Sequence, residues 1–175
     1  IMGGGQLGRM LSVAASRLGL KTHIFEPLPD APAGHVADRV TTAEYNDTEA
    51  LVAFASSVDV VTYEFENIPT EALDIIESIR PIRPGRQALA VSQDRINEKE
   101  FLSDLNLNIA PYAQIDSLDD LTAALETIGV PSILKTRRFG YDGKGQVRIT
   151  EANQAAEAFA ALKGAPAVLE GFVNF

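Results

Sequence analysis

Apolar residues recur along the chain with helical and strand-like spacings in turn, which predicts a layered α/β protein. In residues 7–18 they fall at i, i+3, i+4, i+7, i+8 and i+11, a stripe typical of one helix face, and Gly19 can end that helix. A short β-prone run follows at residues 22–25, so the order predicts a β-α-β unit. The same alternation of strand and helix is repeated, with a strand predicted at residues 58–65 and a helix at 70–79. Strands that alternate with helices indicate a parallel sheet covered on both faces.

The pattern changes after a segment rich in proline and glycine at residues 81–85, which marks a domain boundary. Beyond it, two β-prone runs are joined by a short loop, as in a hairpin, so this second sheet should be antiparallel. We therefore expect a Rossmann-like parallel-sheet domain over residues 1–92 and the start of an α+β domain over residues 93–175. The elements expected in the second part are helices at 94–105, 117–128 and about 153–162, a hairpin within 133–149 and a strand from Ala167.

The loop of that hairpin carries the most informative chemistry of the chain. Lys135 ends an apolar run, so a strand would hold its ammonium group in a defined place. The loop adds three glycines, which let the backbone approach an anion closely, and three cations: Gly140, Gly143, Gly145, Arg137, Arg138 and Lys144. It is not a P-loop, because Gln146 and Val147 stand where lysine and serine or threonine would follow. These residues favour a loop that folds over the phosphates of a nucleotide. The alternative is an ordinary basic hairpin turn without a ligand.

A second glycine-rich segment, GGGQLG at residues 3–8, matches the dinucleotide-binding fingerprint and precedes the first helix. It would place a pyrophosphate at a helix N-terminus, with Glu26 near the position of a ribose-binding acid. A tight turn whose glycines only allow close packing, or a site for a smaller phosphorylated ligand, explains the same residues. Gln6 favours polar recognition of a ligand but does not choose between these three.

Charged groups follow other predicted strands, and the carboxyl ends of strands are where parallel sheets bind ligands. Glu64 and Glu66, in YEFEN at residues 63–67, would point to one side if the strand persists through them, and could accept hydrogen bonds from ribose hydroxyls or an amine. A solvated strand end is the alternative. Glu170 could form a hydrogen bond with the edge of a nucleotide base that is held between apolar side chains. An ordinary strand end is the alternative. Arg95 is either surface charge or an anion contact.

Composition narrows the classes of function. The net charge of −9 argues against a nucleic-acid surface, and no apolar run is long enough to span a membrane, so we expect a cytoplasmic protein. The absence of cysteine excludes a disulfide, a thiolate zinc site and a cysteine nucleophile, and the two histidines lack metal-ligand spacing. Met2 runs into glycines without the usual strand, and the strand from Ala167 lacks a continuation. We expect the front part of a longer protein.

Four segments together resemble the ATP-grasp superfamily, and most closely its N5-carboxyaminoimidazole ribonucleotide synthetase family, the biotin-independent carboxylases of purine biosynthesis. The segments are GGGQLGRM at residues 3–10, TYEFENIP at 62–69, QDR at 93–95 and KTRRFGYDGKGQ at 135–146. The resemblance covers essentially the whole chain, and its last segment is specific, since the related formate-dependent glycinamide ribonucleotide transformylases differ there. The implied fold is a Rossmann-like pre-ATP-grasp domain followed by the first, lid-bearing part of an ATP-grasp domain.

The resemblance also implies roles for individual residues. The first glycine turn would serve the ribonucleotide substrate rather than a dinucleotide, through Gln6, Leu7 and Glu64. The magnesium-binding acids, and a part that helps to hold the substrate phosphate, would lie beyond Phe175, so this chain alone should not catalyse. ATP would be bound at its phosphates by Arg95 and Lys135. A flexible lid over the phosphates would be formed by Gly140, Tyr141, Asp142, Gly143, Lys144, Gly145 and Gln146. A hinge that contacts the adenine would be formed by Glu170, Gly171, Phe172 and Val173.

The implied reaction uses ATP and Mg²⁺ to activate bicarbonate. ATP phosphorylates bicarbonate to carboxyphosphate, and the amine of aminoimidazole ribonucleotide then forms the carbamate, with ADP and phosphate as products. The family implies a homodimer, with Tyr141 and Asp142 near the bicarbonate. Three alternatives stay open: another ATP-grasp ligase such as the formate-dependent transformylase, an NAD-binding oxidoreductase built on the first glycine turn, and a regulatory module that binds nucleotide without turnover.

Overall fold

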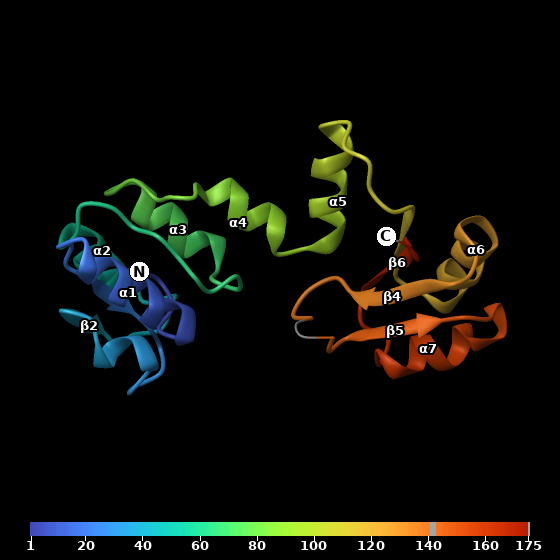
Figure 1. Ribbon diagram of the computed structural model, residues 1–175, viewed down its shortest axis with the longest axis horizontal. Helices are drawn as coiled ribbons and strands as arrows, with labels where there is room; N and C mark the ends of the chain where they lie inside the picture. The colour runs from blue at the N-terminus through green and yellow to red at the C-terminus, as the bar shows by residue number, and fades with distance from the viewer. Residues whose placement is uncertain (141–142, 175) are drawn as a thin grey trace. The chain divides into compact units, whose positions relative to one another are not determined.

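The structure, a computed structural model, describes residues 1–140 and 143–174 of the chain (Figure 1). It divides into two compact units, Ile1–Ala90 and Val91–Phe175, each with its own hydrophobic core. The domain boundary expected after residue 92 stays a prediction. Within the described residues, no helix is both long enough and apolar enough to cross a lipid bilayer.

The first unit is built on parallel strand segments, as the sequence predicts. Isolated bridges extend the β1–β2 pair, so that among the described residues five segments lie in the spatial order third, second, first, fourth, fifth. This is the strand order of the Rossmann fold. The parallel pairs are β1 (His23–Phe25) with β2 (Arg39–Thr41), Met2 with Phe25 and with Tyr63, and Val61 with Ile82.

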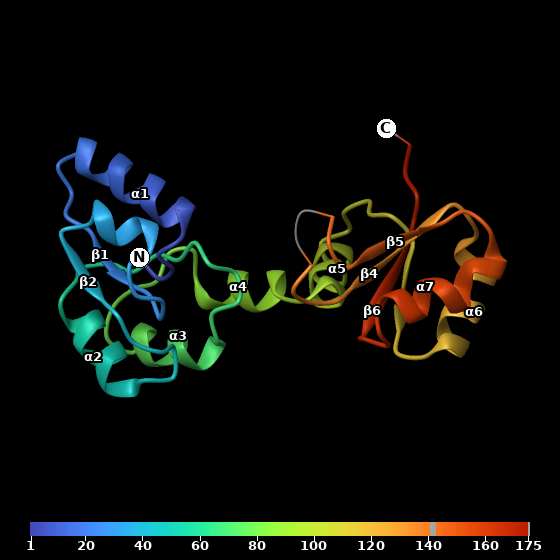
Figure 2. The same cartoon turned by 90° about the horizontal axis from the view of Figure 1, so that it is seen from below.

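Helices cover both faces of this sheet, with α1 on one side and α2 and α3 on the other (Figure 2). The core between them is formed by buried side chains of the strands and of α2 and α3, among them Met2, Phe25, Leu51, Phe54, Val61, Leu73 and Ile76. The helical elements are α1 (Gln6–Arg17), the 3-10 turn η1 (Pro32–His35), α2 (Thr48–Ser56), α3 (Thr70–Glu77) and α4 (Arg86–Ser92).

The strand predicted at residues 58–65 is present only as single bridges at Val61 and Tyr63. The chain then leaves the sheet and turns at residues 66–67. Because the strand does not persist, the alternation that would have sent Glu64 and Glu66 to the same side does not apply.

The helix α1 turns a narrow face of small residues toward the sheet. Gly8 and Ser12 are its buried residues, and a Cβ atom at Gly8 would lie only 2.6 Å from the carbonyl oxygen of Gly3. The helix therefore lies directly against the glycine turn, where no larger side chain fits. Its apolar stripe faces away from the core of this unit, with Leu7, Met10, Leu11 and Leu18 between 41% and 78% exposed.

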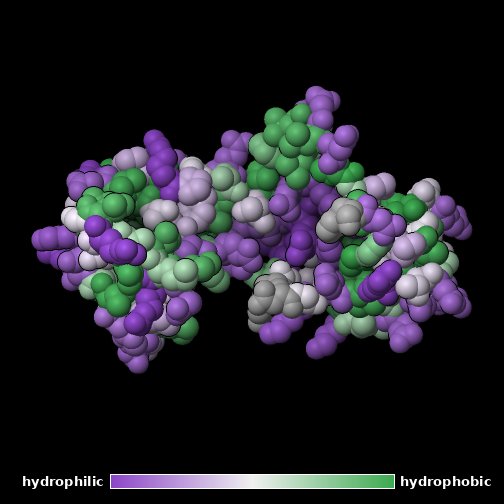
Figure 3. Space-filling model, in the orientation of Figure 1, coloured by the Kyte–Doolittle hydropathy of each residue, from purple (hydrophilic) through white to green (hydrophobic). Residues whose placement is uncertain are grey.

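The second unit holds an antiparallel sheet in the order β3-β6-β4-β5, which confirms the pairing predicted from the hairpin. Figure 3 shows apolar surface gathered over α5, where Phe101 is 41% and Leu105 55% exposed. The elements are α5 (Arg95–Asp104), β3 (Tyr112–Ile115), α6 (Leu118–Ile128), β4 (Ser132–Thr136), β5 (Gln146–Ile149), η2 (Ala152–Gln154), α7 (Ala155–Ala161) and β6 (Ala167–Gly171).

The two faces of this second sheet differ in character, because successive side chains of a strand point to opposite sides. Leu134 of β4 pairs with Leu169 of β6, and both are buried in a core that α6 and α7 complete. Lys135 and Glu170 come one residue later in each strand, so they lie on the opposite face. One face of the sheet thus carries the core and the other carries charged groups.

Candidate functional site

The glycine turn of the first unit is closed by two carboxylates. The backbone N–H of Gly4 donates to Oε2 of Glu26 at 2.7 Å, and that of Gly5 donates to Oε1 of Glu64 at 2.9 Å. These are amides that a pyrophosphate would need at a helix N-terminus. Because they already bind carboxylates, which would also repel a phosphate, the turn does not suit a dinucleotide. Glu26 was expected to bind a ribose hydroxyl in the dinucleotide-binding alternative. In the structure it stabilises the turn through its hydrogen bond from Gly4.

The predicted substrate residues surround this same turn. Gln6 and Leu7 begin α1 with exposed side chains, and Glu64 reaches the turn from residue 64 of the neighbouring segment. A Cβ atom at Gly3, whose φ is +99°, would lie 3.0 Å from the Glu64 side chain, so the approach of the carboxylate requires glycine there. The structure brings the three residues together, and their contact with a substrate stays a prediction.

Tyr45 lies beside these acids and was not found from the sequence. Its ring stacks on Phe25 and Phe65 at centroid distances of 5.8 Å and 6.2 Å. Its hydroxyl is buried and has no hydrogen-bond partner among the described residues. Burial raises the pKa of Tyr45, and the nearby charges of Glu26 and Glu64 raise it further, so the phenol stays neutral.

In the second unit, Glu170 lies between two lysines. Lys135 Nζ donates to Oε2 of Glu170 at 2.8 Å, and Lys99 Nζ lies 3.4 Å from Oε1. All three side chains are largely buried, between 12% and 19% exposed. Burial alone would raise the pKa of Glu170, but the hydrogen bond from Lys135 and the charge of Lys99 hold it below its ordinary value. The cluster carries two positive charges against one negative charge, so it suits an anionic ligand.

The start of α5 is fastened to the loop that follows β4. Asp94 caps α5 by accepting from the N–H of Ile96 at 2.9 Å, and it also accepts from Arg137 at 2.8 Å and 3.0 Å. The backbone N–H of Arg95 donates to the carbonyl of Arg137 at 3.1 Å, and its guanidinium reaches the carbonyl of Gly140 at 3.4 Å. Arg137 thus links this loop to the start of α5, and the positive charge that it was expected to add for a polyphosphate stays a prediction. Arg95 is held beside the glycine loop.

Part of the predicted lid lies within the described residues. Gly143 and Gly145 have φ of +78° and +68°, a region that favours glycine, and Gly145 packs against Thr136. Lys144 is exposed, and Gln146 pairs with Lys135 at the base of the hairpin. Tyr141 and Asp142, also predicted to bind ATP, lie outside the described residues.

The predicted hinge follows directly from Glu170. Gly171 ends β6 and donates to the carbonyl of Pro111 at 2.8 Å, while Phe172 and Val173 are 37% and 49% exposed. Arg148 of β5 lies over the Phe172 ring, 4.5 Å from its centroid. This neighbour was not found from the sequence, because the contact joins β5 to a residue just after β6, and the two are distant in the chain.

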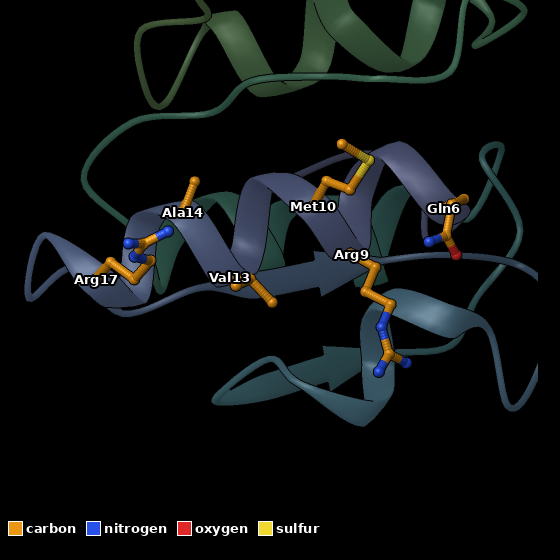
Figure 4. A pocket seen from close by; sticks show the side chains of 6 residues that line it. All are labelled: Gln6, Arg9, Met10, Val13, Ala14 and Arg17. Atoms are coloured by element: carbon orange, nitrogen blue, oxygen red, sulfur yellow. The ribbon is translucent and has the colours of Figure 1, made fainter.

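The described residues include no group of three or more histidine, cysteine, aspartate or glutamate side chains placed to hold a metal ion. A hollow of about 280 Å³ lies on the outer side of α1, lined by Gln6, Arg9, Met10, Val13, Ala14 and Arg17 (Figure 4). Its lining is of mixed polarity, and of the predicted site residues it includes Gln6.

Comparison with known proteins identifies both parts of this arrangement. Residues 1–93 match the family model of the ribonucleotide synthetase pre-ATP-grasp domain, and residues 100–175 match that of the ATP-grasp domain. The chain belongs to the ribonucleotide synthetase pre-ATP-grasp family. The predicted fold class, a Rossmann-like pre-ATP-grasp domain followed by ATP-grasp sequence, is thereby confirmed, as is the resemblance that predicted it.

Individual members of the family are similar over the whole chain. The N5-carboxyaminoimidazole ribonucleotide synthase of Brucella melitensis is 50% identical over 177 residues, which covers 100% of this chain and 49% of the relative. N5-carboxyaminoimidazole synthetase from Staphylococcus aureus complexed with ADP has a TM-score of 0.92 at 38% identity, covering 99% of this chain and 46% of the other. The Aspergillus clavatus synthase in complex with ADP and 5-aminoimidazole ribonucleotide has a TM-score of 0.87 at 31% identity, with coverage of 99% and 46%. The chain spans about half the length of the curated relatives it matches.

Proposed function

We propose that this chain supplies the nucleotide grip and part of the substrate site of an ATP-dependent carboxylase of aminoimidazole ribonucleotide. The observation that carries the proposal is the buried, net-positive cluster formed by Lys135 and Glu170, on the charged face of the second sheet, with Lys99 of α5. A nucleoside triphosphate is the ligand that matches it, because it offers phosphate oxygens for Lys135 and a base edge for the carboxylate of Glu170. The relatives that have been solved with ADP support this assignment.

Within this proposal, Arg95 and Lys135 bind phosphate oxygens of ATP, and the loop at residues 140–146 closes over them. Glu170 accepts a hydrogen bond from the adenine amino group, and the following residues, Gly171, Phe172 and Val173, lie along the base. The fixed position of Arg95 matters because a donor that is already in place stabilises charge without reorganising during the reaction. Closure of the loop would exclude water from a reactive phosphate.

The reaction joins ATP, bicarbonate and the amine of the ribonucleotide. An oxygen of bicarbonate attacks the γ-phosphorus, ADP leaves, and carboxyphosphate forms. The amine nitrogen then bonds to its carboxyl carbon, directly or after release of CO2, and phosphate departs as the amine loses a proton. Mg²⁺ would neutralise charge on the transferred phosphoryl group, and we expect its ligands outside the described residues.

Gln6, Leu7 and Glu64 are proposed to contact the ribonucleotide at the glycine turn. The exposed amide of Gln6 and the carboxylate of Glu64 suit ribose hydroxyls or the amine. The Aspergillus clavatus relative, which was solved with aminoimidazole ribonucleotide, supports a substrate of this class. The homodimer and the cytoplasmic location expected from the sequence stay predictions.

The decisive experiment measures ADP release by the complete protein from ATP and bicarbonate, with and without aminoimidazole ribonucleotide. We expect strong stimulation by the ribonucleotide, and we expect Lys135→Ala to weaken ATP binding. Turnover that is indifferent to this ribonucleotide but stimulated by glycinamide ribonucleotide and formate would instead favour the transformylase. The NAD alternative is the weakest, since carboxylates occupy the turn that it needs.

A further inference from the structure

Lys99 is a buried cation that the sequence did not single out. It extends from α5 with 12% of its side chain exposed, and its ammonium lies 5.4 Å from the centroid of the Tyr112 ring. Its charged partner is Glu170, at 3.4 Å. Tyr112 pairs with Glu170 across β3 and β6, so both side chains lie on the same face of the sheet, toward α5. The lysine is therefore held over the carboxylate by its own helix and by an aromatic ring.

The two lysines do not have equivalent positions around Glu170. Lys135 is on β4, in the strand that leads into the glycine loop, whereas Lys99 is on α5, four residues after Arg95. Under the proposed function, Lys135 turns toward the phosphates when a nucleotide binds. Glu170 would then lose its 2.8 Å partner. If Lys99 were absent, Glu170 would then be a buried carboxylate without a cationic partner, which is strongly disfavoured. Glu170 would either hold Lys135 back from the phosphates or take up a proton.

We propose that Lys99 is a positioning residue that keeps Glu170 ionised and correctly aimed while Lys135 binds phosphate. An ionised carboxylate accepts a hydrogen bond, which suits the amino group of adenine, whereas guanine carries a carbonyl oxygen at the corresponding position. Lys99 would thereby determine specificity for adenine nucleotides without touching the nucleotide. The inference rests on the proposed function and adds to it a residue and a role.

The test is calorimetric titration of the complete protein with ADP and with GDP. The variants are Lys99→Met, which keeps much of the side-chain volume, and Lys99→Arg, which keeps the charge. Lys163→Met is the matched control, because Lys163 is an exposed lysine of the same unit and the change in net charge is identical. We expect Lys99→Met to weaken ADP binding at least about tenfold and to narrow the preference for ADP over GDP. Lys99→Arg should restore most of the binding, and the control should match the wild type.

A double-mutant cycle separates positioning from a general loss of stability. If Lys99 acts through Glu170, Lys99→Met should have little further effect on ADP affinity in a Glu170→Gln background. The cycle is to be measured below the melting temperature of each variant. If Lys99→Met does not fold, Lys99→Gln, which also removes the charge but keeps a polar side chain, takes its place in the same cycle.

The outcomes separate the two proposals. Wild-type protein that binds neither nucleotide would overturn the proposed function. Wild-type protein that binds ADP, together with a folded Lys99→Met variant of equal affinity and equal preference, would overturn the role of Lys99 alone. Effects of Lys99→Met that persist in full in the Glu170→Gln background would overturn it as well.

Discussion

At the scale of single residues, the second unit is organised around charges that are only partly hydrated. Glu170 and Asp94 both have pKa values held below the ordinary range, since burial opposes ionisation but their cationic partners outweigh it. Glu170 is the more deeply placed and has two lysines, whereas Asp94 has Arg137 and the N–H groups at the start of α5. At both positions, the contacts that hold the carboxylate in place also lower its pKa.

The first prediction concerns the pH dependence of folding. Because the pKa of Glu170 is lower in the folded than in the unfolded state, its contribution to stability is present above its ordinary pKa of 4.5 and is lost as the pH falls through the folded value. The Glu170→Gln variant lacks this contribution. Its free energy of unfolding should therefore fall less than that of the wild type between about pH 6 and about pH 3, as measured by urea denaturation. Parallel losses in the two proteins would contradict the assignment.

The second prediction concerns the glycine that closes the loop. Gly145 and Gly164 have nearly the same φ, +68° and +67°, but a Cβ atom at Gly145 would lie 2.7 Å from Oγ1 of Thr136, whereas nothing lies within 4 Å at Gly164. Alanine at either position costs about 1–2 kcal/mol for the left-handed backbone. Only Gly145→Ala must also displace Thr136, so its melting temperature and its affinity for ADP should fall further than those of Gly164→Ala. Equal effects would show that the contact with Thr136 is unimportant.

At the scale of elements, the arrangement depends on how helices begin. Asp94 and Ser117 both cap helices through side-chain oxygens that accept from backbone N–H groups. Asp94 has a second role, because its carboxylate also binds Arg137 in the loop after β4. The start of α5, with Arg95 as its first residue, is thus fixed to the residues that lead from β4 into the segment predicted to close over ATP.

The third prediction separates these two roles of Asp94. Asparagine is as good a helix cap as aspartate but lacks the charge, so Asp94→Asn should lose only the ion pair. Asp94→Ala should lose the cap as well, with a further decrease of about 1 kcal/mol in the free energy of unfolding, and Ser117→Ala supplies the matched loss of a cap alone. Both Asp94 variants should weaken ADP binding, since Arg95 is less constrained, whereas Ser117→Ala should not. Denaturation and titration of the three variants test this.

The elements also show what the sequence could and could not predict. The helices α1, α3, α5, α6 and α7, whose apolar residues recur at helical spacing, were predicted to within about two residues, as was the β4–β5 hairpin. The helices α2 and α4 and the strands β2 and β3 were not predicted. Strands of three and four residues carry too little periodicity, and their pairing is decided by partners elsewhere in the chain. The same limit applies to the site: Lys135 and Glu170 were found from local motifs, but Lys99 and Arg148 depend on contacts across elements.

At the scale of the whole molecule, the described residues form two cores that share no residue. One core contains Leu73 and lies in the first unit, and the other contains Leu134 and lies in the second. Under the proposed function, the Rossmann-like unit would bind the ribonucleotide at its glycine turn, and the antiparallel unit would bind ATP at its charged face. Each site is therefore supported by a core of its own.

The fourth prediction follows from these separate cores. Leu73→Ala and Leu134→Ala each remove a fully buried side chain and should each cost about 2–5 kcal/mol. Hydrogen exchange followed by mass spectrometry should show increased exchange only in the unit that carries the substitution. Loss of protection in both units from either variant would mean that the two cores unfold together.

The alternation of side chains along β4 and β6 determines where the chain can accept insertions and deletions. Each strand alternates residues that are packed in the core with residues that lie on the opposite, charged face, so the insertion or deletion of a single residue would exchange the two sets. Leucine would then face solvent, and a charged side chain would enter the interior. Natural and engineered variation in length should therefore be confined to the connecting loops, while substitutions within these two strands can alter one face and leave the other intact.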